Sequence, residues 1–447
     1  MKGQVKMGYN IGMVSLGCAK NQTDAETMLG ILADRGHKLV CDPAEADVIV
    51  VNTCGFIESA KQESIDTILE MAEYKNERCK LLIVSGCLAE RYNKEIIKEL
   101  PEVDAVVGTG DFDKIAEIME KAFNNEKPLV YGHIDQSPEE GLPRVLSTPS
   151  YTAYLKIADG CDNRCTYCAI PMIRGKFRSR RIEAITAEAK ELAKSGVKEI
   201  ILIAQDTTRY GVDIYGKYAL SELLEELVKI EDIRWIRLHY FYTEAVTDEL
   251  IETMAKYDKI LNYIDMPIQH INDTILRRMA RRTNRKEIEE KIRKIREKMP
   301  DSTIRTSIIV GFPGETDEQF EELYEFLKEA EFDRAGVFAY SREEGTPAAE
   351  FENQIDDEIK NERLNRLMTL QQEISKKKNQ AKISKVVEVV TEGYDEDNFM
   401  YFGRSRADSI DVDSLVYFAA EDEVELGEFV NVEILDCDEI DLTGRQI

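Results

Sequence analysis

Residues 161–168 read Cys161-Asp162-Asn163-Arg164-Cys165-Thr166-Tyr167-Cys168, and this run decides how the rest of the chain is interpreted. Three thiols at this spacing can ligate one metal centre, and a four-iron cluster bound by only three cysteines leaves one iron free for a substrate. A structural zinc site needs four protein ligands, and the nearest histidines lie far away in sequence. A thioredoxin-like CxxC pair would leave Cys161 unexplained. The run therefore favours an open iron–sulfur site over these two alternatives.

Upstream of the motif, short apolar runs alternate with helical patterns, which predicts an amino-terminal open parallel α/β sheet over residues 1–135. The expected strands are 11–16, 48–51 and 81–84, and the expected helices are 24–35, 58–74 and 89–100. Residues 136–150 contain three prolines and little apolar periodicity, which predicts a linker.

Downstream, the same alternation continues on a larger scale and predicts a central (β/α) barrel or partial barrel over residues 151–378. Its expected strands include 199–204, 235–240, 304–310 and 336–339. The cysteine motif follows an apolar run at 154–158, at the expected carboxyl end of the first barrel strand, where such barrels build their active sites. Valine-rich alternation over residues 379–447 predicts a small antiparallel β-barrel. The expected fold class is therefore α/β with a carboxyl-terminal β-barrel.

Three further cysteines share one placement in the amino-terminal sheet. Cys18, Cys54 and Cys87 each follow a predicted parallel strand. Because the carboxyl ends of parallel strands face a common crevice, these thiols can converge on a second three-cysteine site. The alternative is that they are small buried hydrophobic residues, which is the interpretation we favour for Cys41, Cys79 and Cys437.

The charge of the chain limits its partners. There are 86 acidic and 59 basic residues, a formal net charge of −27, which argues against a surface built throughout for nucleic-acid phosphates. Residues 379–447 carry 18 acidic and 5 basic residues, so this tail favours a lysine- and arginine-rich protein partner over RNA. Residues 277–298, with 11 basic and 4 acidic residues, could contact RNA, but a solvated helix face is favoured.

The apolar segments and the cysteines predict where in the cell the protein lies. No uninterrupted apolar stretch approaches 18 residues and the start lacks a secretory signal, so we expect a cytoplasmic protein with no membrane partner. In a reducing compartment, nine cysteines indicate metal or redox chemistry rather than disulfides.

The motif resembles the signature of the radical S-adenosylmethionine (SAM) superfamily, which has this spacing and an aromatic residue, here Tyr167, before the third cysteine. The resemblance implies that Cys161, Cys165 and Cys168 hold a [4Fe–4S] cluster. Its open iron would chelate the methionyl amine and carboxylate of SAM, and one electron would cleave SAM to a 5′-deoxyadenosyl radical.

Over essentially the whole chain, the three-part organisation resembles the methylthiotransferases. This resemblance implies a second [4Fe–4S] cluster on Cys18, Cys54 and Cys87 that supplies or binds sulfur, consumption of two SAM molecules, and a substrate-presenting tail called the TRAM domain. Residues 15–21, 160–171, 205–208 and 265–270 are similar to the members that modify the β-carbon of an aspartate in small-subunit ribosomal protein twelve. The tRNA-modifying members usually have Gln-Met-Asn after the first cysteine.

The resemblance therefore implies a basic ribosomal protein as partner, free or on the ribosome, together with a low-potential electron donor, and it does not imply tRNA. Two alternatives stay open at this point. One is a tRNA adenosine methylthiotransferase, and the other is a non-catalytic iron–sulfur carrier.

Four more positions are candidate cofactor contacts. Tyr167 lies within the motif, and Gln205 and Gln269 follow predicted strands and should line the same barrel mouth. Gly311 begins a Gly-Phe-Pro-Gly turn after another strand and would let the backbone approach a ligand closely, although a plain tight turn explains it equally well. Among the basic residues at 174–181, one or two could pair with a carboxylate, but a solvated loop is favoured for most.

Overall fold

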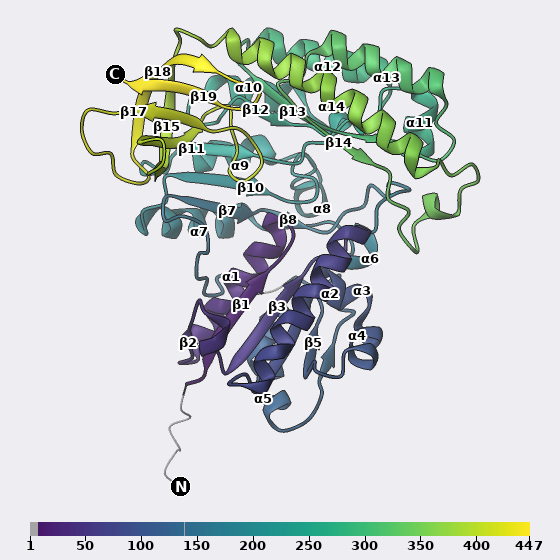
Figure 1. Ribbon diagram of the computed structural model, residues 1–447, viewed down its shortest axis with the longest axis vertical. Coiled ribbons are helices and arrows are strands. Elements are labelled where there is room, and N and C mark those ends of the chain that lie inside the picture. Colours follow the sequence, from purple (N-terminus) through teal and green to yellow (C-terminus); the bar gives the residue numbers. More distant parts are fainter. Residues whose placement is uncertain (1–7, 138) are drawn as a thin grey trace.

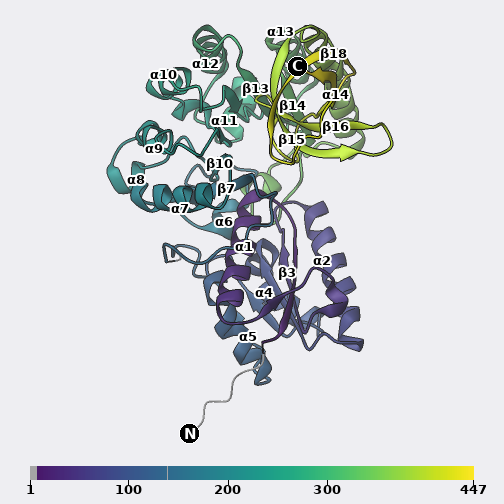
Figure 2. The same cartoon turned by 90° about the vertical axis from the view of Figure 1, so that its left-hand side faces the viewer.

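The computed structural model describes residues 8–137 and 139–447. An amino-terminal α/β unit lies at the bottom of Figure 1, a larger α/β unit lies above it, and a small β-barrel packs beside the upper unit. Figure 2 shows that the amino-terminal unit sits beneath the end of the larger unit where α1 and α6 meet. The expected fold class is confirmed.

The amino-terminal unit is a parallel sheet with the strand order β2-β1-β3-β4-β5-β6. Its strands are β1 (Asn10–Ser15), β2 (Lys38–Leu39), β3 (Val48–Thr53), β4 (Leu81–Gly86), β5 (Ala105–Val107) and β6 (Leu129–Val130). Its helices are α1 (Ala19–Asp34), α2 (Glu58–Glu73), α3 (Cys87–Arg91), α4 (Asn93–Glu99) and α5 (Ile115–Phe123). Strands β3 and β4 are buried at every position because separate apolar clusters cover the two faces of the sheet.

Two helices differ from expectation. The helix expected at 24–35 begins at Ala19, because its first turn is buried through polar contacts that leave no apolar periodicity. The helix expected at 89–100 divides at Tyr92, whose backbone is not helical. There the Asn93 side chain donates a hydrogen bond to the Glu90 carbonyl oxygen and competes with helix propagation.

The central unit is a partial barrel made of two parallel sheets, with strand orders β11-β10-β7 and β12-β13-β14. A parallel bridge between Ile236 and Ile260 joins them. The strands are β7 (Thr152–Lys156), β8 (Ala158–Asp159), β9 (Arg178–Ser179), β10 (Glu199–Ile203), β11 (Trp235–Leu238), β12 (Tyr263–Asp265), β13 (Thr303–Val310) and β14 (Arg334–Ala339), of which β8 and β9 form a separate antiparallel pair.

Helices cover the outside of this partial barrel and bury its main apolar core. They are α7 (Ile182–Lys194), α8 (Val212–Tyr215), α9 (Leu220–Leu227), α10 (Asp248–Lys256), α11 (Asp273–Arg278), α12 (Arg285–Lys298), α13 (Asp317–Ala330) and α14 (Asp357–Gln380). The short helix α6 (Ile170–Arg174) instead packs against Cys87 of the amino-terminal unit. Short 3-10 turns are η1 (Pro43–Glu45), η2 (Tyr74–Asn76), η3 (Phe112–Lys114), η4 (Thr243–Ala245) and η5 (Pro347–Glu350). In the described residues, no helix has both the length and the apolar character needed to cross a membrane.

The carboxyl-terminal unit is a closed barrel with the order β15-β16-β17-β19-β18. Its strands are β15 (Val386–Asp395), β16 (Met400–Ser405), β17 (Val416–Ala419), β18 (Phe429–Cys437) and β19 (Leu442–Gln446). The pairs are antiparallel, as expected, except that β17 and β19 run parallel. Figure 1 shows this barrel beside the strands of the central unit, with α14 leading into it.

Buried polar contacts fix the β-barrel to the central unit. Glu199 at the start of β10 accepts hydrogen bonds from Arg237 at 2.9 Å and from Arg404 of β16 at 2.7 Å. Burial raises the pKa of Glu199, but the two guanidinium groups outweigh this effect and bring it to about 2. The loop at 406–415 adds Ser409 Oγ, which lies 2.8 Å from His239 Nε2. The two units therefore share one polar interior.

Candidate active site

The 161–168 loop lies between β8 and α6 and is anchored at both ends. The Cys161 amide donates to the Gly175 carbonyl oxygen at 3.0 Å, and the Cys168 amide donates to the Cys165 carbonyl oxygen at 3.0 Å. The Thr166 hydroxyl donates to the Arg278 carbonyl oxygen at 2.8 Å, which ties the loop to the end of α11. Backbone contacts therefore hold the three cysteines in place.

The thiols of this loop share one desolvated environment. Burial raises the pKa of Cys161 to about 11 and raises that of Cys168 further, and in both cases Cys165 adds to the rise. Thiols with such pKa values ionise only if a cation binds, which fits a site whose positive charge is supplied by bound iron. Within residues 8–137 and 139–447, no three His, Cys, Asp or Glu side chains approach closely enough to hold a single metal ion. A four-iron cluster does not need that convergence, because each cysteine binds a different iron.

Aromatic rings and one arginine surround the loop. The Tyr242 hydroxyl lies 3.6 Å from Cys165 Sγ, and the guanidinium of Arg281 lies 4.2 Å from the centroid of the Tyr242 ring. Tyr167 packs against the apolar cluster that contains Phe312 and Tyr340. Arg281 is buried, and its Nε has no hydrogen-bond partner in the described part of the chain. This donor is available to an anionic group of a ligand.

The other candidate cofactor contacts have different surroundings. Gln205 donates to Asp159 Oδ1 at 2.8 Å, and its buried Oε1 has no partner among the described residues. Gln269 has a φ of 69° and forms a parallel bridge with Ile308, so it turns the chain at the barrel mouth. The space in front of Gly311 holds the Lys360 side chain, whose Cγ would lie 2.3 Å from an added Cβ. The close approach at Gly311 is therefore to α14.

The amino-terminal cysteines also come together. Cys18, Cys54 and Cys87 follow β1, β3 and β4 at the carboxyl edge of the sheet. Burial raises the pKa of Cys87 to about 12; Arg174 opposes the rise, and Cys18 and Cys54 add to it. A Cβ on Gly17, whose φ is 90°, would lie 3.1 Å from Cys54 Sγ, so only glycine fits there.

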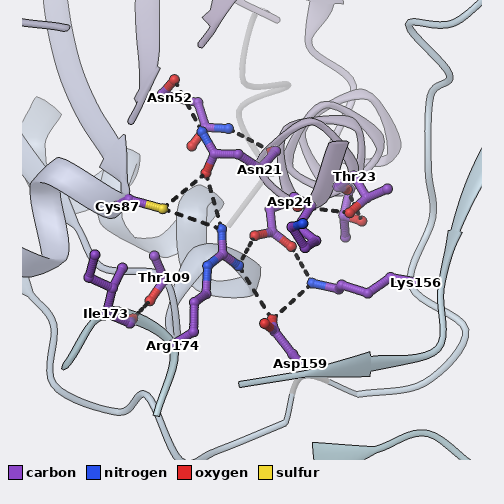
Figure 3. A network of polar contacts seen from close by, with 12 residues as sticks. Asn21, Thr23, Asp24, Asn52, Cys87, Thr109, Lys156, Asp159, Ile173 and Arg174 are labelled. Atoms are coloured by element: carbon purple, nitrogen blue, oxygen red, sulfur yellow. Dashed lines mark hydrogen bonds and ion pairs between the residues drawn. The ribbon is translucent and has the colours of Figure 1, made fainter. Parts of the chain in front are cut away.

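Asn21 connects the loops that carry these three cysteines, as Figure 3 shows in part. Its Nδ2 donates to the Leu16 carbonyl oxygen at 2.7 Å and to the Thr53 carbonyl oxygen at 3.2 Å. Its Oδ1 accepts the Cys87 thiol proton at an Sγ to Oδ1 distance of 4.0 Å. One side chain therefore links the backbone before Cys18, the backbone before Cys54 and the thiol of Cys87.

Two cations distinguish the amino-terminal site. Desolvation of the Cys18 thiol raises its pKa, but the charges of Lys20 and Arg174 outweigh this and lower it below its ordinary value. Lys20 is buried, and its Nζ lies 3.3 Å from the centroid of the Tyr240 ring. Burial alone would lower the pKa of Lys20, but Tyr240 and Cys18 raise it overall. The ammonium group therefore keeps its charge.

Arg174 joins the two cysteine sites. It ends α6, the helix that follows the 161–168 loop, and it donates to Cys87 Sγ at 3.7 Å (Figure 3). Its guanidinium also pairs with Asp24 of α1 at 2.5 Å and with Asp159 at 3.3 Å. Lys156 of β7 contacts the same two carboxylates at 2.5 and 3.2 Å. The expectation of a solvated basic loop does not apply to Arg174, which is 2% exposed.

A second set of ion pairs holds the two units on the other side of the site. Glu343, in the loop after β14, lies 2.9 Å from Arg91 and 3.2 Å from Lys61. Arg91 belongs to α3, which begins at Cys87, and it also donates to the Glu344 carbonyl oxygen at 2.6 Å. The cysteine-bearing edge of the sheet is therefore fixed against the barrel mouth.

Sequence reasoning missed the residues between the two sites. Lys20, Asn21 and Asp24 stand directly after Cys18, so proximity to that cysteine was the available signal. For Arg174 the signal was its position one short helix after Cys168. Pattern alone did not indicate that these residues meet, because the contact forms between separate units.

Three family models match the chain. "Radical SAM superfamily" matches residues 155–327, "Uncharacterized protein family UPF0004" matches residues 10–108, and "TRAM domain" matches residues 383–447. The fold resembles that of the radical SAM methyltransferase TsrM from Kitasatospora setae, with a TM-score of 0.57 at 15% identity over 76% of this chain and 74% of that one. It also resembles the cobalamin-dependent radical SAM enzyme OxsB, with a TM-score of 0.52 at 13% identity over 81% of this chain and 56% of that one. The fold and the motif define a radical SAM enzyme, a class that uses an iron–sulfur cluster and SAM.

Relatives of similar length define the family. A protein of Clostridioides difficile (strain 630) named "Ribosomal protein uS12 methylthiotransferase RimO" is 54% identical over 97% of this chain and 98% of its own length. A protein of the same name from Thermoanaerobacter sp. (strain X514) is 51% identical over 98% of this chain and 99% of its own length. The chain therefore belongs to the RimO family of radical SAM methylthiotransferases, and it is an enzyme rather than a non-catalytic iron–sulfur carrier.

Proposed function

We propose that this protein inserts a methylthio group at the β-carbon of an aspartate in ribosomal protein uS12. The observation that carries the proposal is the position of Arg174, which follows the 161–168 loop and contacts Cys87 of the amino-terminal trio. Two cysteine sites held in one interface suit a reaction in which hydrogen abstraction and sulfur transfer take place on one carbon atom. The names of the RimO relatives support uS12 as the substrate.

Cys161, Cys165 and Cys168 would hold one [4Fe–4S] cluster, and Cys18, Cys54 and Cys87 would hold a second. When bound, the first cluster and SAM supply a 5′-deoxyadenosyl radical, the second cluster supplies or binds sulfur, and another SAM supplies the methyl group. Tyr167, Gln205, Gln269 and Gly311 are the proposed neighbours of SAM.

The chain's own residues have three tasks in this scheme. Gln205 Oε1 offers an acceptor for the methionyl amine, and Arg281 Nε offers a donor for the methionyl carboxylate, since both atoms are buried without partners in the described residues. Tyr167 and Tyr242 exclude water around the 161–168 loop. Asn21 and Arg174 keep the amino-terminal thiols at a fixed position relative to that loop.

The TRAM domain supports a basic protein partner, because residues 379–447 carry a large excess of acidic residues. The proposed substrate places the reaction in the cytoplasm, on free or ribosome-bound uS12, with a low-potential electron donor. The basic segment 277–298 would favour RNA, but on α12 Arg293 pairs with Glu297 at 2.6 Å and Lys294 pairs with Asp248 at 3.0 Å, which supports the solvated helix face.

The test is a product assay on the protein reconstituted anaerobically with iron and sulfide. It receives SAM, a reductant and, in separate reactions, free uS12, small ribosomal subunits or tRNA. Mass spectrometry should find one methylthio group on a uS12 aspartate and none on tRNA. Modified tRNA with unmodified uS12 would overturn the proposal. The triple variant Cys161→Ala/Cys165→Ala/Cys168→Ala is the negative control.

A further inference from the structure

Lys20 is a buried cation at the amino-terminal cysteine site. The residue is 7% exposed, and its ammonium nitrogen lies over the Tyr240 ring, 3.3 Å from the centroid. Its strongest electrostatic partners are Tyr240 and Cys18, and among the described residues no carboxylate forms an ion pair with it. An ammonium group has three donors, and one aromatic ring and one thiol do not use all of them, so this buried nitrogen can still bind an anionic ligand.

The neighbouring cations differ from Lys20 in this respect. Lys156 and Arg174 are also buried or nearly so, and both pair with Asp24 and Asp159. The carboxylates of this interface are thus shared between two other cations. Lys20 is left with a positive charge that these carboxylates do not neutralise.

Lys20 lies between the two halves of the proposed reaction centre. It belongs to the first turn of α1, two residues after Cys18, whereas Tyr240 stands just after β11 at the carboxyl edge of the partial barrel and has a φ of 63°. Ala19 and Tyr240 pack on the same apolar cluster, which includes Ile203 of β10. The ammonium group therefore lies where the Cys18 end of the amino-terminal sheet meets the carboxyl edge of the partial barrel.

We infer that Lys20 binds the side-chain carboxylate of the aspartate that is modified. This inference rests on the proposed function and adds the residue that recognises the substrate. A charge-assisted hydrogen bond from Nζ to the carboxylate would hold the adjacent β-carbon between the two cysteine sites. A neutral nucleobase offers no charge to the ammonium group, so the same residue selects an acidic side chain over an adenosine.

Binding measurements test this assignment. The probes are uS12 and its variant with asparagine at the modified aspartate, each titrated into reconstituted protein in the absence of reductant. Wild type should bind the aspartate form more tightly than the asparagine form. Lys20→Met should weaken binding of the aspartate form by about thirtyfold or more and should leave binding of the asparagine form unchanged. Lys20→Arg should retain most of the preference, because it keeps the charge.

Lys98→Met is the matched control, since Lys98 is an exposed lysine on α4 whose side chain is 80% exposed. It should bind both probes as wild type does. Iron content and circular dichroism check that each variant is folded. If Lys20→Met fails to fold, the wild-type preference for aspartate over asparagine still decides, because equal affinity for the two forms overturns the inference.

The contrary outcomes are distinct. A Lys20→Met variant that keeps the preference overturns the inference, and so does one that loses affinity for both probes equally, which would make Lys20 a counter-ion of the cysteine site. In either case wild type would still modify uS12, and the proposed function would stand. Wild type that neither binds nor modifies uS12 would overturn both.

Discussion

The two cysteine sites of this protein are built in opposite ways. The 161–168 loop brings its three thiols together within eight residues, and buried aromatic rings surround it. The amino-terminal trio comes from three strand ends spread over residues 18–87, and the cations Lys20 and Arg174 lie beside it. Burial raises the pKa of Cys161 to about 11 and that of Cys87 to about 12, whereas Lys20 and Arg174 lower the pKa of Cys18 below its ordinary value.

This difference indicates different chemical roles. At the 161–168 loop, burial disfavours ionised thiols until iron binds, and the surrounding aromatic rings protect a reactive radical from water. A site lined by cations stabilises anionic sulfur and attracts a carboxylate. Electrostatic surroundings, rather than the number of cysteines, therefore separate the two sites.

The largest effects are expected when the cysteines of one site are removed at a time. Cys161→Ala/Cys165→Ala/Cys168→Ala should reduce the iron content from about eight to about four atoms per chain and abolish SAM cleavage. Cys18→Ala/Cys54→Ala/Cys87→Ala should lose the same amount of iron but keep SAM cleavage. Iron assay and detection of 5′-deoxyadenosine measure both. Equal iron in wild type and the second variant would show that the amino-terminal cysteines are ordinary core residues.

Removal of Arg174, which connects the two cysteine sites, should have the next largest effect. Arg174→Gln removes the shared guanidinium from Asp24 and Asp159 but leaves Lys156 in contact with both, so it should lower the free energy of unfolding by about 1.5–3 kcal/mol. Denaturant unfolding and hydrogen exchange of α1 and α6, both on iron-free protein, measure this. Lys98→Gln, which alters an exposed pair on α4, should change stability by less than about 0.5 kcal/mol. Unchanged exchange in α1 would mean that Arg174 does not couple the units.

Acid should weaken the interface between the TRAM domain and the central unit. This effect should be independent of the two cysteine sites. The pKa of Glu199 is about 2 against an ordinary 4.5, so its ionised form stabilises the fold above pH 4.5 and this contribution is lost as pH falls towards 2. The amount is about 3 kcal/mol. Thermal unfolding as a function of pH measures it. Glu199→Gln should be less stable at neutral pH and should lack this dependence; a variant with the wild-type pH profile would contradict the assignment.

The smallest expected effects come from single hydroxyls that support each site. At the amino-terminal site, the Ser64 hydroxyl accepts a hydrogen bond from the Cys54 amide at 3.0 Å and donates one to the Cys54 carbonyl oxygen at 2.8 Å. At the 161–168 loop, the Thr166 hydroxyl donates to the Arg278 carbonyl oxygen at 2.8 Å. Ser64→Ala and Thr166→Val should each cost about 1–2 kcal/mol. Each should accelerate hydrogen exchange at its own site only. Acceleration at both sites from either variant would show that the sites are not separately supported.

Much of the fold was predictable because apolar periodicity reports burial directly. Strands β3 and β4 are buried on both faces and read as continuous apolar runs, and the motif placed Cys161 at the barrel mouth. The start of α1 was missed because Lys20, Asn21 and Thr23 are buried polar residues, and no hydropathy pattern reveals such burial. The break at Tyr92 was missed because it depends on one side-chain hydrogen bond from Asn93.

The candidate site was predictable to the level of the six cysteines but no further. The convergence of Cys18, Cys54 and Cys87 followed from parallel topology, which is a local consequence of strand order. The partners of Arg174 come from two separate units, and a solvated arginine and a buried one look alike in a sequence. The same limit explains Gly311. Its lack of a side chain leaves room for Lys360, which lies on α14 about 50 residues later in the chain.

The buried contacts of Glu199 bear on how this enzyme can be recombined. Arg404 from β16 and Ser409 from the loop at 406–415 reach into the central unit, where they meet Glu199 and His239. A chimaera that grafts the TRAM domain of a tRNA-modifying relative onto this chain would place foreign side chains against those two residues. Exchange of substrate preference by domain grafting should therefore succeed only when the partners of Glu199 and His239 are transplanted together with the barrel.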